Sequence, residues 1–205
     1  FDNSAGQWAS IDTREYFRKN IDAIAEAGFS IPFIPVFDIQ FGGYARYLIP
    51  QKVRYSGKPG SASLDVTKTT ALSGYMAGPL ARFVVLNGST LGLIVEGRLG
   101  LGILKVQQTI DSTEGSSALD ASAFSAEIGA LVGIRYAISP GIGAQLTCGY
   151  MRNRTNSLSA GSDGTGDYSS IKKGDRLFVR NGGETHELKV DRGGYFAGLS
   201  VSFRI

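Results

Sequence analysis

Strict two-residue alternation of apolar and polar or small side chains dominates this sequence after residue 36, and it constrains the fold most strongly. It occurs in six runs of 9 to 15 residues: 37–49, 74–86, 91–103, 124–138, 142–150 and 194–205. In one of them Phe124 and Ala126 alternate with Ser125 and Glu127. A period of two places successive side chains on opposite faces of a strand, so each run predicts a β-strand with one apolar face.

The connections between these runs differ in length. The short ones are 87–90 and 139–141, and the long, polar ones are 50–72, 104–122 and 152–192. Lys58-Pro59-Gly60 predicts a hairpin tip whose flanking strands extend further, and Asn181-Gly182-Gly183 predicts a small hairpin inside the last long loop. Short turns at one end and long loops at the other predict an all-β, antiparallel up-and-down barrel over residues 36–205.

Residues 10–29 show the spacing of a helix instead. Asp12 with Glu15 matches a capping box, and Gly28 matches a C-cap. One helical face between them carries Phe17, Ile21, Ile24 and Ala25. We therefore interpret residues 1–35 as an N-terminal helical segment that docks on the barrel or plugs it. An interfacial membrane helix is the alternative, and the modest apolar face disfavours it.

The polar face decides whether the barrel is a soluble one or a membrane one. It is crowded with Gly, Ser and Ala, and it carries no Lys in the six runs. Its charged residues are Asp38, Arg46, Arg82, Glu96, Arg98, Glu127, Arg135 and Arg204. Small residues with Arg and carboxylates suit a narrow lumen in which charges pair across the interior. This composition predicts an internal ion-pair network and a lipid-facing apolar side, and an anion-preferring constriction in a narrow channel is the alternative interpretation.

Aromatic residues near the two ends of the apolar faces support the same assignment. The outer girdle, on the long-loop side, consists of Tyr47, Tyr75, Phe124, Tyr150 and Tyr195, and the inner girdle of Phe37, Phe83, Tyr136 and Phe203. Within a strand the two are 8 to 12 residues apart. At about 3.3 Å per residue and a tilt near 45°, this separation spans roughly 19–28 Å, which brackets the ~25 Å apolar band of a membrane barrel.

Several segments resemble one known family. GYMAGPLARFVVL followed by LGLIVEGRLGLGI, and then AEIGALVGIRYAISPGIGAQLTCGY, are similar to hairpins of the small bacterial outer-membrane β-barrel family related to the OmpA barrel, in the porin superfamily. The end, GYFAGLSVSFRI, resembles the terminal strand that the barrel-assembly machinery reads, although Ile205 is last and Phe203 precedes it by two places. The resemblance implies eight strands, two more than the six runs, and it says little about activity.

The residues with catalytic or metal-binding chemistry are few. His186 is the only histidine and lies in a loop without a His-x-Ser spacing, so a lipid A-modifying enzyme is disfavoured. Asp163 and Asp167 lack the dense carboxylates of a calcium loop, and Cys148 is expected to face lipid as a small apolar residue. A net charge of +3 is too small to indicate nucleic-acid binding. We expect no metal, no cofactor and no catalytic residue.

These observations predict a non-enzymatic integral outer-membrane protein that acts through its external loops as a structural, adhesive or complex-forming component. The long loops are expected outside the cell, and the short turns and C-terminus in the periplasm. The expected partners are outer-membrane lipids, the assembly machinery, a stable membrane complex and lipopolysaccharide, whose phosphates could meet Lys58, Lys68, Lys172, Lys173, Arg176 and Arg180. A narrow channel and a soluble lipocalin-like binder remain alternatives. The start at Phe1 rather than Met is expected of a processed chain.

Overall fold

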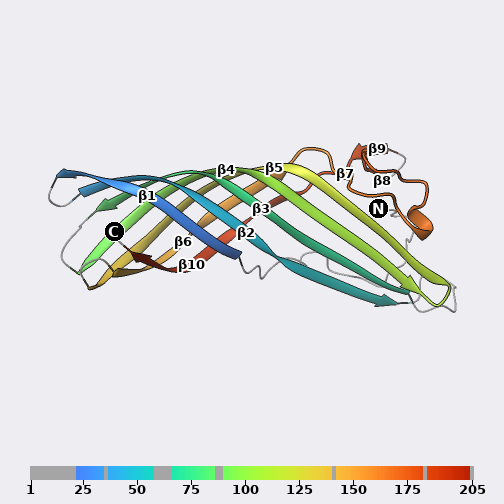
Figure 1. Ribbon diagram of the computed structural model, residues 1–205, viewed down its shortest axis with the longest axis horizontal. Helices are drawn as coiled ribbons and strands as arrows, with labels where there is room; N and C mark the ends of the chain where they lie inside the picture. The colour runs from blue at the N-terminus through green and yellow to red at the C-terminus, as the bar shows by residue number, and fades with distance from the viewer. Residues whose placement is uncertain are drawn as a thin grey trace.

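Seven long antiparallel strands form one sheet in the computed structural model, which describes residues 22–34, 37–57, 66–85, 90–139, 142–181 and 184–203. The strands are β1 (Asp22–Ile34), β2 (Phe37–Gly57), β3 (Val66–Val85), β4 (Leu91–Ser112), β5 (Gly115–Ser139), β6 (Ile142–Thr155) and β10 (Asp191–Phe203). Each pairs with its neighbour in this order, and together they make the elongated, twisted sheet of Figure 1. The predicted all-β, up-and-down antiparallel topology is therefore confirmed.

The helix predicted over residues 10–29 is wrong where the structure describes it. Residues 22–34 are strand β1, and β1 pairs with β2 from Asp22 opposite Leu48 to Ile34 opposite Phe37. The same residues also alternate with period two, because Ala23, Ala25, Ala27, Phe29 and Ile31 all occupy one face. Pairing with β2 favours this second pattern over helical propensity, which is a weak preference. The other part of the predicted helix, residues 10–21, lies outside the described residues.

The strands β2 to β5 are longer than the alternating runs of the sequence. They contain 21, 20, 22 and 25 residues, about twice the 9–11 residues that a membrane-crossing strand needs. The predicted loop 104–122 is wrong, because β4 and β5 continue through it and meet at a turn of residues 113–114. The predicted extension of the strands that flank Lys58-Pro59-Gly60 is confirmed, because β2 reaches Gly57, β3 begins at Val66 and the two remain paired there. We call this long-strand end of the sheet the extension.

Residues 156–190 fold against the inward face of the extension, and we call this segment the cap. It contains β7 (Ser159–Ala160), which pairs with β5, a 3-10 turn η2 (Gly166–Tyr168), and the hairpin of β8 (Phe178–Asn181) and β9 (Glu184–Glu187). The hairpin predicted around Asn181-Gly182-Gly183 is confirmed by the pairing of Asn181 with Glu184. Cap and strands share one apolar core, formed by Leu48, Leu72, Met76, Leu104, Val106, Leu119, Ala121, Ala123, Leu158, Ala160 and Leu177.

The sheet has two free edges, β1 and β10, which do not pair with each other among the described residues. The described part is therefore an open, curled sheet rather than the predicted closed barrel. Tyr195 and Leu199 on β10 are 95% and 79% exposed, more than outward residues of the central strands. None of the residues described forms a helix of the length and hydrophobicity needed to cross a membrane.

Candidate functional site

Five of the eight residues predicted for the lumen network are buried together on the inward face of the sheet. They are Arg46 on β2, Arg82 on β3, Glu96 and Arg98 on β4, and Glu127 on β5. Each is 8% exposed or less. Alternation places them on this face, and inward glycines of neighbouring strands leave room for the large side chains.

The other three predicted network residues are placed differently. Asp38 on β2 and Arg135 on β5 are partly exposed rather than buried. Arg204 lies outside the described residues. The buried network is therefore built around five of the eight predicted residues.

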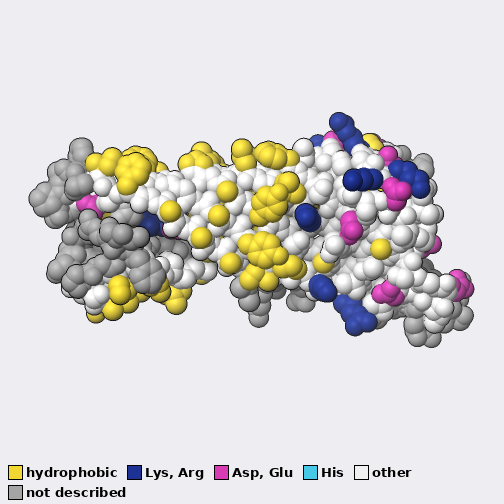
Figure 2. Space-filling view, in the orientation of Figure 1, with side chains coloured by type: hydrophobic (Ala, Val, Ile, Leu, Met, Phe, Trp, Pro, Cys, Tyr) yellow, Lys and Arg dark blue, Asp and Glu magenta, His cyan; other side chains and the backbone are white. Residues whose placement is uncertain are grey.

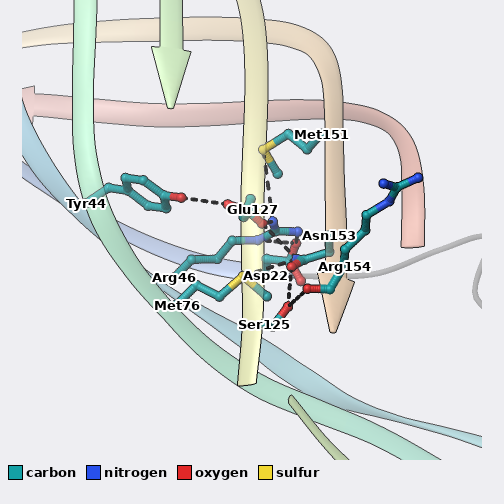
Figure 3. Close-up of polar contacts among 9 residues, drawn as sticks. All are labelled: Asp22, Tyr44, Arg46, Met76, Ser125, Glu127, Met151, Asn153 and Arg154. Atoms are coloured by element: carbon teal, nitrogen blue, oxygen red, sulfur yellow. Dashed lines mark hydrogen bonds and ion pairs between the residues drawn. The ribbon is translucent and has the colours of Figure 1, made fainter. Parts of the chain in front are cut away.

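Glu127 is the centre of the first cluster of polar contacts (Figure 3). Its Oε1 accepts a hydrogen bond from Tyr44 Oη at 2.8 Å, and its Oε2 accepts one from Asn153 Nδ2 at 2.9 Å and pairs with Arg46. Asn153 is oriented in turn by Ser125, whose Oγ donates to Asn153 Oδ1 at 2.7 Å. Tyr44 and Arg46 belong to β2 and Asn153 to β6, so the carboxylate of Glu127 on β5 links three strands and holds them at a fixed distance.

Two arginines and two glutamates form a second cluster beside the first. Arg82 donates to Glu96 Oε2 from Nε at 2.6 Å and to Glu26 Oε2 from Nη2 at 2.6 Å. Arg98 bonds the remaining oxygen of each of the same two glutamates. The guanidinium carbon of Arg98 also lies 5.3 Å from the ring centroid of Tyr44, which joins the two clusters through a cation–π contact.

Four members of these clusters were missed by the sequence interpretation. Asp22 and Glu26 lie on β1, within the predicted helix, and Arg46 Nε donates to Asp22 Oδ2 at 3.0 Å. Tyr44 and Asn153 also belong to the polar faces of their strands. The alternation of Asp22 and Glu26 with the alanines of β1 was the signal that could have found them. Arg192 on β10 also lies within electrostatic range of Asp22, Arg46 and Glu127. Four arginines therefore face four carboxylates, and these charges neutralise one another rather than leave a cationic channel wall.

The other sequence candidates offer little chemistry. His186 on β9 is exposed, and its Nε2 lies 3.2 Å from Oε2 of Glu184. Asp163 accepts a hydrogen bond from the backbone N–H of Lys173. Asp167 lies in the 3-10 turn η2 of the cap. Cys148 is an exposed free cysteine on the outward face of β6. Across the described ranges, no group of three or more His, Cys, Asp and Glu side chains is placed to hold a metal ion.

Eight of the nine residues predicted for the girdles lie on the outward face in two sets, and the side chain of the ninth, Phe203, is outside the described ones. Tyr47 pairs with Tyr75, and Ile103 lies opposite both Tyr75 and Phe124. Tyr150 and Tyr195 are also paired, with ring centroids 5.9 Å apart. At the opposite end, the rings of Phe37 and Phe83 stack with their centroids 6.0 Å apart. In the strand register, Tyr136 lies opposite Leu91, and Phe203 lies opposite Ile142.

Polarity reverses along the long strands at the level of the outer girdle. Below it, outward residues such as Leu101 are apolar and exposed, while inward residues such as Arg98 are charged and buried. Beyond it, Leu104 and Val106 are buried inward, and Lys105 and Gln107 are exposed outward. Figure 2 shows the consequence: hydrophobic side chains cover one part of the molecule, and Lys, Arg, Asp and Glu gather at the end where the extension and cap lie. One continuous sheet thus presents an apolar surface along one length and a water-compatible surface along the next.

One carboxylate joins two parts of the cap, and another joins β10 to β6. Ser157 Oγ donates a hydrogen bond to Glu187, and together with Lys189 this bond lowers the pKa of Glu187 below its ordinary value of 4.5. The hydrogen bond from Arg152, with a second from Arg154, lowers the pKa of Asp191 below its ordinary value of 3.8. Both carboxylates are therefore held in the charged form that their partners bind.

Acid is expected to loosen the cap through Glu187. Because the folded pKa is the lower one, this contact stabilises the cap fully above about pH 4.5, and the contribution is lost as pH falls through the folded pKa. Amide protection factors of residues 184–190, corrected for intrinsic exchange, should therefore fall between about pH 5 and 3. Glu187→Gln should flatten this dependence. Equal pH dependence in the variant and the parent would show that Glu187 does not hold the cap.

Comparison of the chain with family models, with curated proteins and with solved structures finds no match to any of them.

Proposed function

We propose that this protein is a non-enzymatic, membrane-spanning β-barrel of the bacterial outer membrane, and that it acts through its extension and cap as a structural, adhesive or complex-forming component. The observation that carries the proposal is the reversal of polarity at the outer girdle. A protein surrounded by water has no reason to expose a continuous apolar band, because monomeric soluble proteins rarely expose large contiguous apolar patches. A lipid bilayer accounts for both the band and the point where it ends.

An eighth strand that closes the barrel belongs to this proposal. Strands β1 and β10 both start at the extension end and run toward the inner girdle, so a direct bond between them would be a parallel pairing in an antiparallel sheet. One further strand that runs in the opposite direction would pair antiparallel with both. A membrane barrel needs this closure, because unpaired backbone groups in hydrocarbon cost several kcal/mol each, on the order given by transfer energies.

The filled lumen favours a structural role over transport. Arg46, Arg82 and Arg98 are each paired with carboxylates and buried, so they cross-link strands β1 to β5 instead of facing a water column. The interior of a small barrel is just wide enough for such side chains. Beyond this lumen, the apolar core of the cap covers the extension end. The surface that remains available to other molecules is the exterior of the extension and cap, which we place outside the cell.

Heat-modifiability on a denaturing gel tests the proposal. Protein extracted in detergent from the outer-membrane fraction should migrate differently before and after boiling, because a closed barrel resists dodecyl sulfate at room temperature. The mass of the unboiled band should show whether the protein stands alone or in a complex. A soluble protein without a band shift would contradict membrane insertion and favour a ligand-binding barrel in water.

Planar-bilayer recording in the same preparation separates the structural role from the narrow channel. We expect no stable single-channel openings from the parent protein, because the arginines of the lumen are neutralised by their partners. Stable openings that lose their anion preference in Arg98→Glu would contradict the structural role and support the channel.

A further inference from the structure

Five basic side chains stand on the outward face immediately beyond the outer girdle, and we call them the basic belt. They are Lys52 and Arg54 on β2, Lys105 on β4, and Arg152 and Arg154 on β6. Four are exposed, and the side chain of Arg152 is 42% exposed. The sequence interpretation placed its lipopolysaccharide contacts elsewhere, at loop residues such as Lys172 and Arg176, so the belt is a feature that the strands of the extension create.

The position of the belt relative to the girdle is regular. Lys105 follows Ile103 by two residues, and Ile103 lies opposite the girdle residues Tyr75 and Phe124. Arg152 and Arg154 follow Tyr150 by two and four residues. At about 3.3 Å per residue and a tilt near 45°, separations of two to seven residues place the charges roughly 5–16 Å beyond the aromatic rings. This is the depth at which lipid headgroups lie next to a hydrocarbon core.

The belt carries an excess of positive charge on one side of the apolar band only. Asp191 pairs with both Arg152 and Arg154, at 2.7 and 3.0 Å, and neutralises one of those two charges. Asp120, exposed on the same face of β5 four residues beyond Phe124, offsets one more, so an excess of three positive charges remains. Lys52, Arg54 and Lys105 make no ion pair with any described residue. At the inner end, the outward positions described on β3 to β6 are apolar, among them Val85, Leu91, Ile138 and Ile142.

We infer that the basic belt binds anionic, phosphate-bearing lipid headgroups of the leaflet on the extension side. This inference rests on the proposed membrane insertion and adds the class of lipid that surrounds the protein there. Phosphate groups accept charge-assisted hydrogen bonds from Lys and Arg, and basic residues beside a membrane surface attract anionic lipids individually. A belt spread over β2, β4 and β6 contacts a ring of lipids rather than one bound molecule.

Lipid selectivity at the surface of the inserted protein tests the belt. The protein is reconstituted in phosphatidylcholine vesicles that contain spin-labelled phosphatidylglycerol or spin-labelled phosphatidylcholine, and the motionally restricted fraction of each label is measured. The parent protein should prefer the anionic label, and added salt should weaken this preference. In the triple variant Lys52→Gln/Arg54→Gln/Lys105→Gln, the preference for the anionic label should fall by up to about fivefold for each cation replaced. The matched control Lys172→Gln/Lys173→Gln/Arg176→Gln removes three cations from the cap and should keep the preference.

The outcomes separate the belt from membrane insertion itself. Band shifts on boiling are recorded for all three proteins, so a shift without anionic preference in the parent would overturn the belt and leave insertion standing. Equal losses in the belt variant and the cap variant would also overturn the belt, since net charge alone would then explain the selectivity. Inorganic phosphate that abolishes the preference at the same ionic strength would show a free-anion site instead of a lipid surface. Failure of the parent to insert would overturn both proposals.

Discussion

Glu127→Ala is expected to lower the free energy of unfolding by about 3–5 kcal/mol, the usual cost of removing one partner from a buried ion pair. Glu127 is 4% exposed and accepts bonds from Tyr44, Arg46 and Asn153. The alanine variant leaves the guanidinium of Arg46 buried with Asp22 as its remaining partner, and it leaves the Tyr44 hydroxyl without an acceptor. Urea unfolding in detergent micelles, followed by circular dichroism and by the gel shift, measures the loss.

Two matched variants show whether charge or volume causes this effect. Glu127→Gln keeps the size and one oxygen acceptor but removes the negative charge. We therefore expect it to lower the free energy of unfolding, but by less than Glu127→Ala does. Asp191→Asn breaks the exposed pairs with Arg152 and Arg154 and should lower the free energy of unfolding much less than Glu127→Ala does, because water screens exposed pairs. Equal small losses in Glu127→Ala and Asp191→Asn would show that the lumen network contributes no stability.

Gly102→Ala should destabilise the protein by about 2–3 kcal/mol or more, because overpacking against backbone cannot relax by a rotamer change. A Cβ at Gly102 would lie 1.9 Å from the backbone oxygen of Tyr75 and 2.7 Å from the Cα of Met76. The neighbouring strands β3 and β4 would have to separate, which would weaken the pairing that closes this side of the lumen. Thermal and urea unfolding of the variant in micelles measure the effect.

Gly97→Ala is the control for this change on the same strand. A Cβ at Gly97 would meet nothing within 4 Å, and the residue faces outward in the apolar band. We expect no loss or a gain of up to roughly 0.5–1 kcal/mol, because alanine restricts the unfolded chain and favours the strand. Similar losses at Gly97 and Gly102 would contradict the close approach of β3 and β4 at Tyr75.

The strands that were predictable from the sequence are those with an apolar outward face. The alternation in 124–138 or 91–103 needs no partner to be recognised, so their direction and faces follow from the residues alone. Strand β1 was mistaken for a helix because Ile24 and Ala25 also fit a 3.6-residue period, and only pairing with β2 decides between the two. The extension of β4 and β5 was mistaken for a loop because Lys105 and Gln107 break the apolar outward pattern, although Leu104 and Val106 continue the alternation with inverted polarity.

The partners within the lumen were less predictable than its members. Alternation identifies Arg46, Glu96 and Glu127 as inward residues. It does not reveal that Arg46 pairs with Glu127, three strands away, rather than with Glu96. That choice depends on the stagger between strands and on how tightly the sheet curls, and these are properties of the whole sheet. For the same reason, the sequence does not show which of the many polar residues on inward faces bind Glu127. Tyr44 and Asn153, the two other donors to its carboxylate, could therefore not be predicted.

Under the proposed membrane insertion, the shared direction of β1 and β10 also affects how copies meet in a crowded membrane before the proposed eighth strand is in place. Exposed strand edges invite fusion with other sheets, and most proteins suppress this with charges, prolines or bulges. Copies inserted from the same side have all their free edges running the same way, so any two of them could join only through parallel pairing, which is slightly less stable per residue. An odd number of strands therefore discourages a half-assembled sheet from polymerising with its neighbours, while a single oppositely directed strand fits both edges at once.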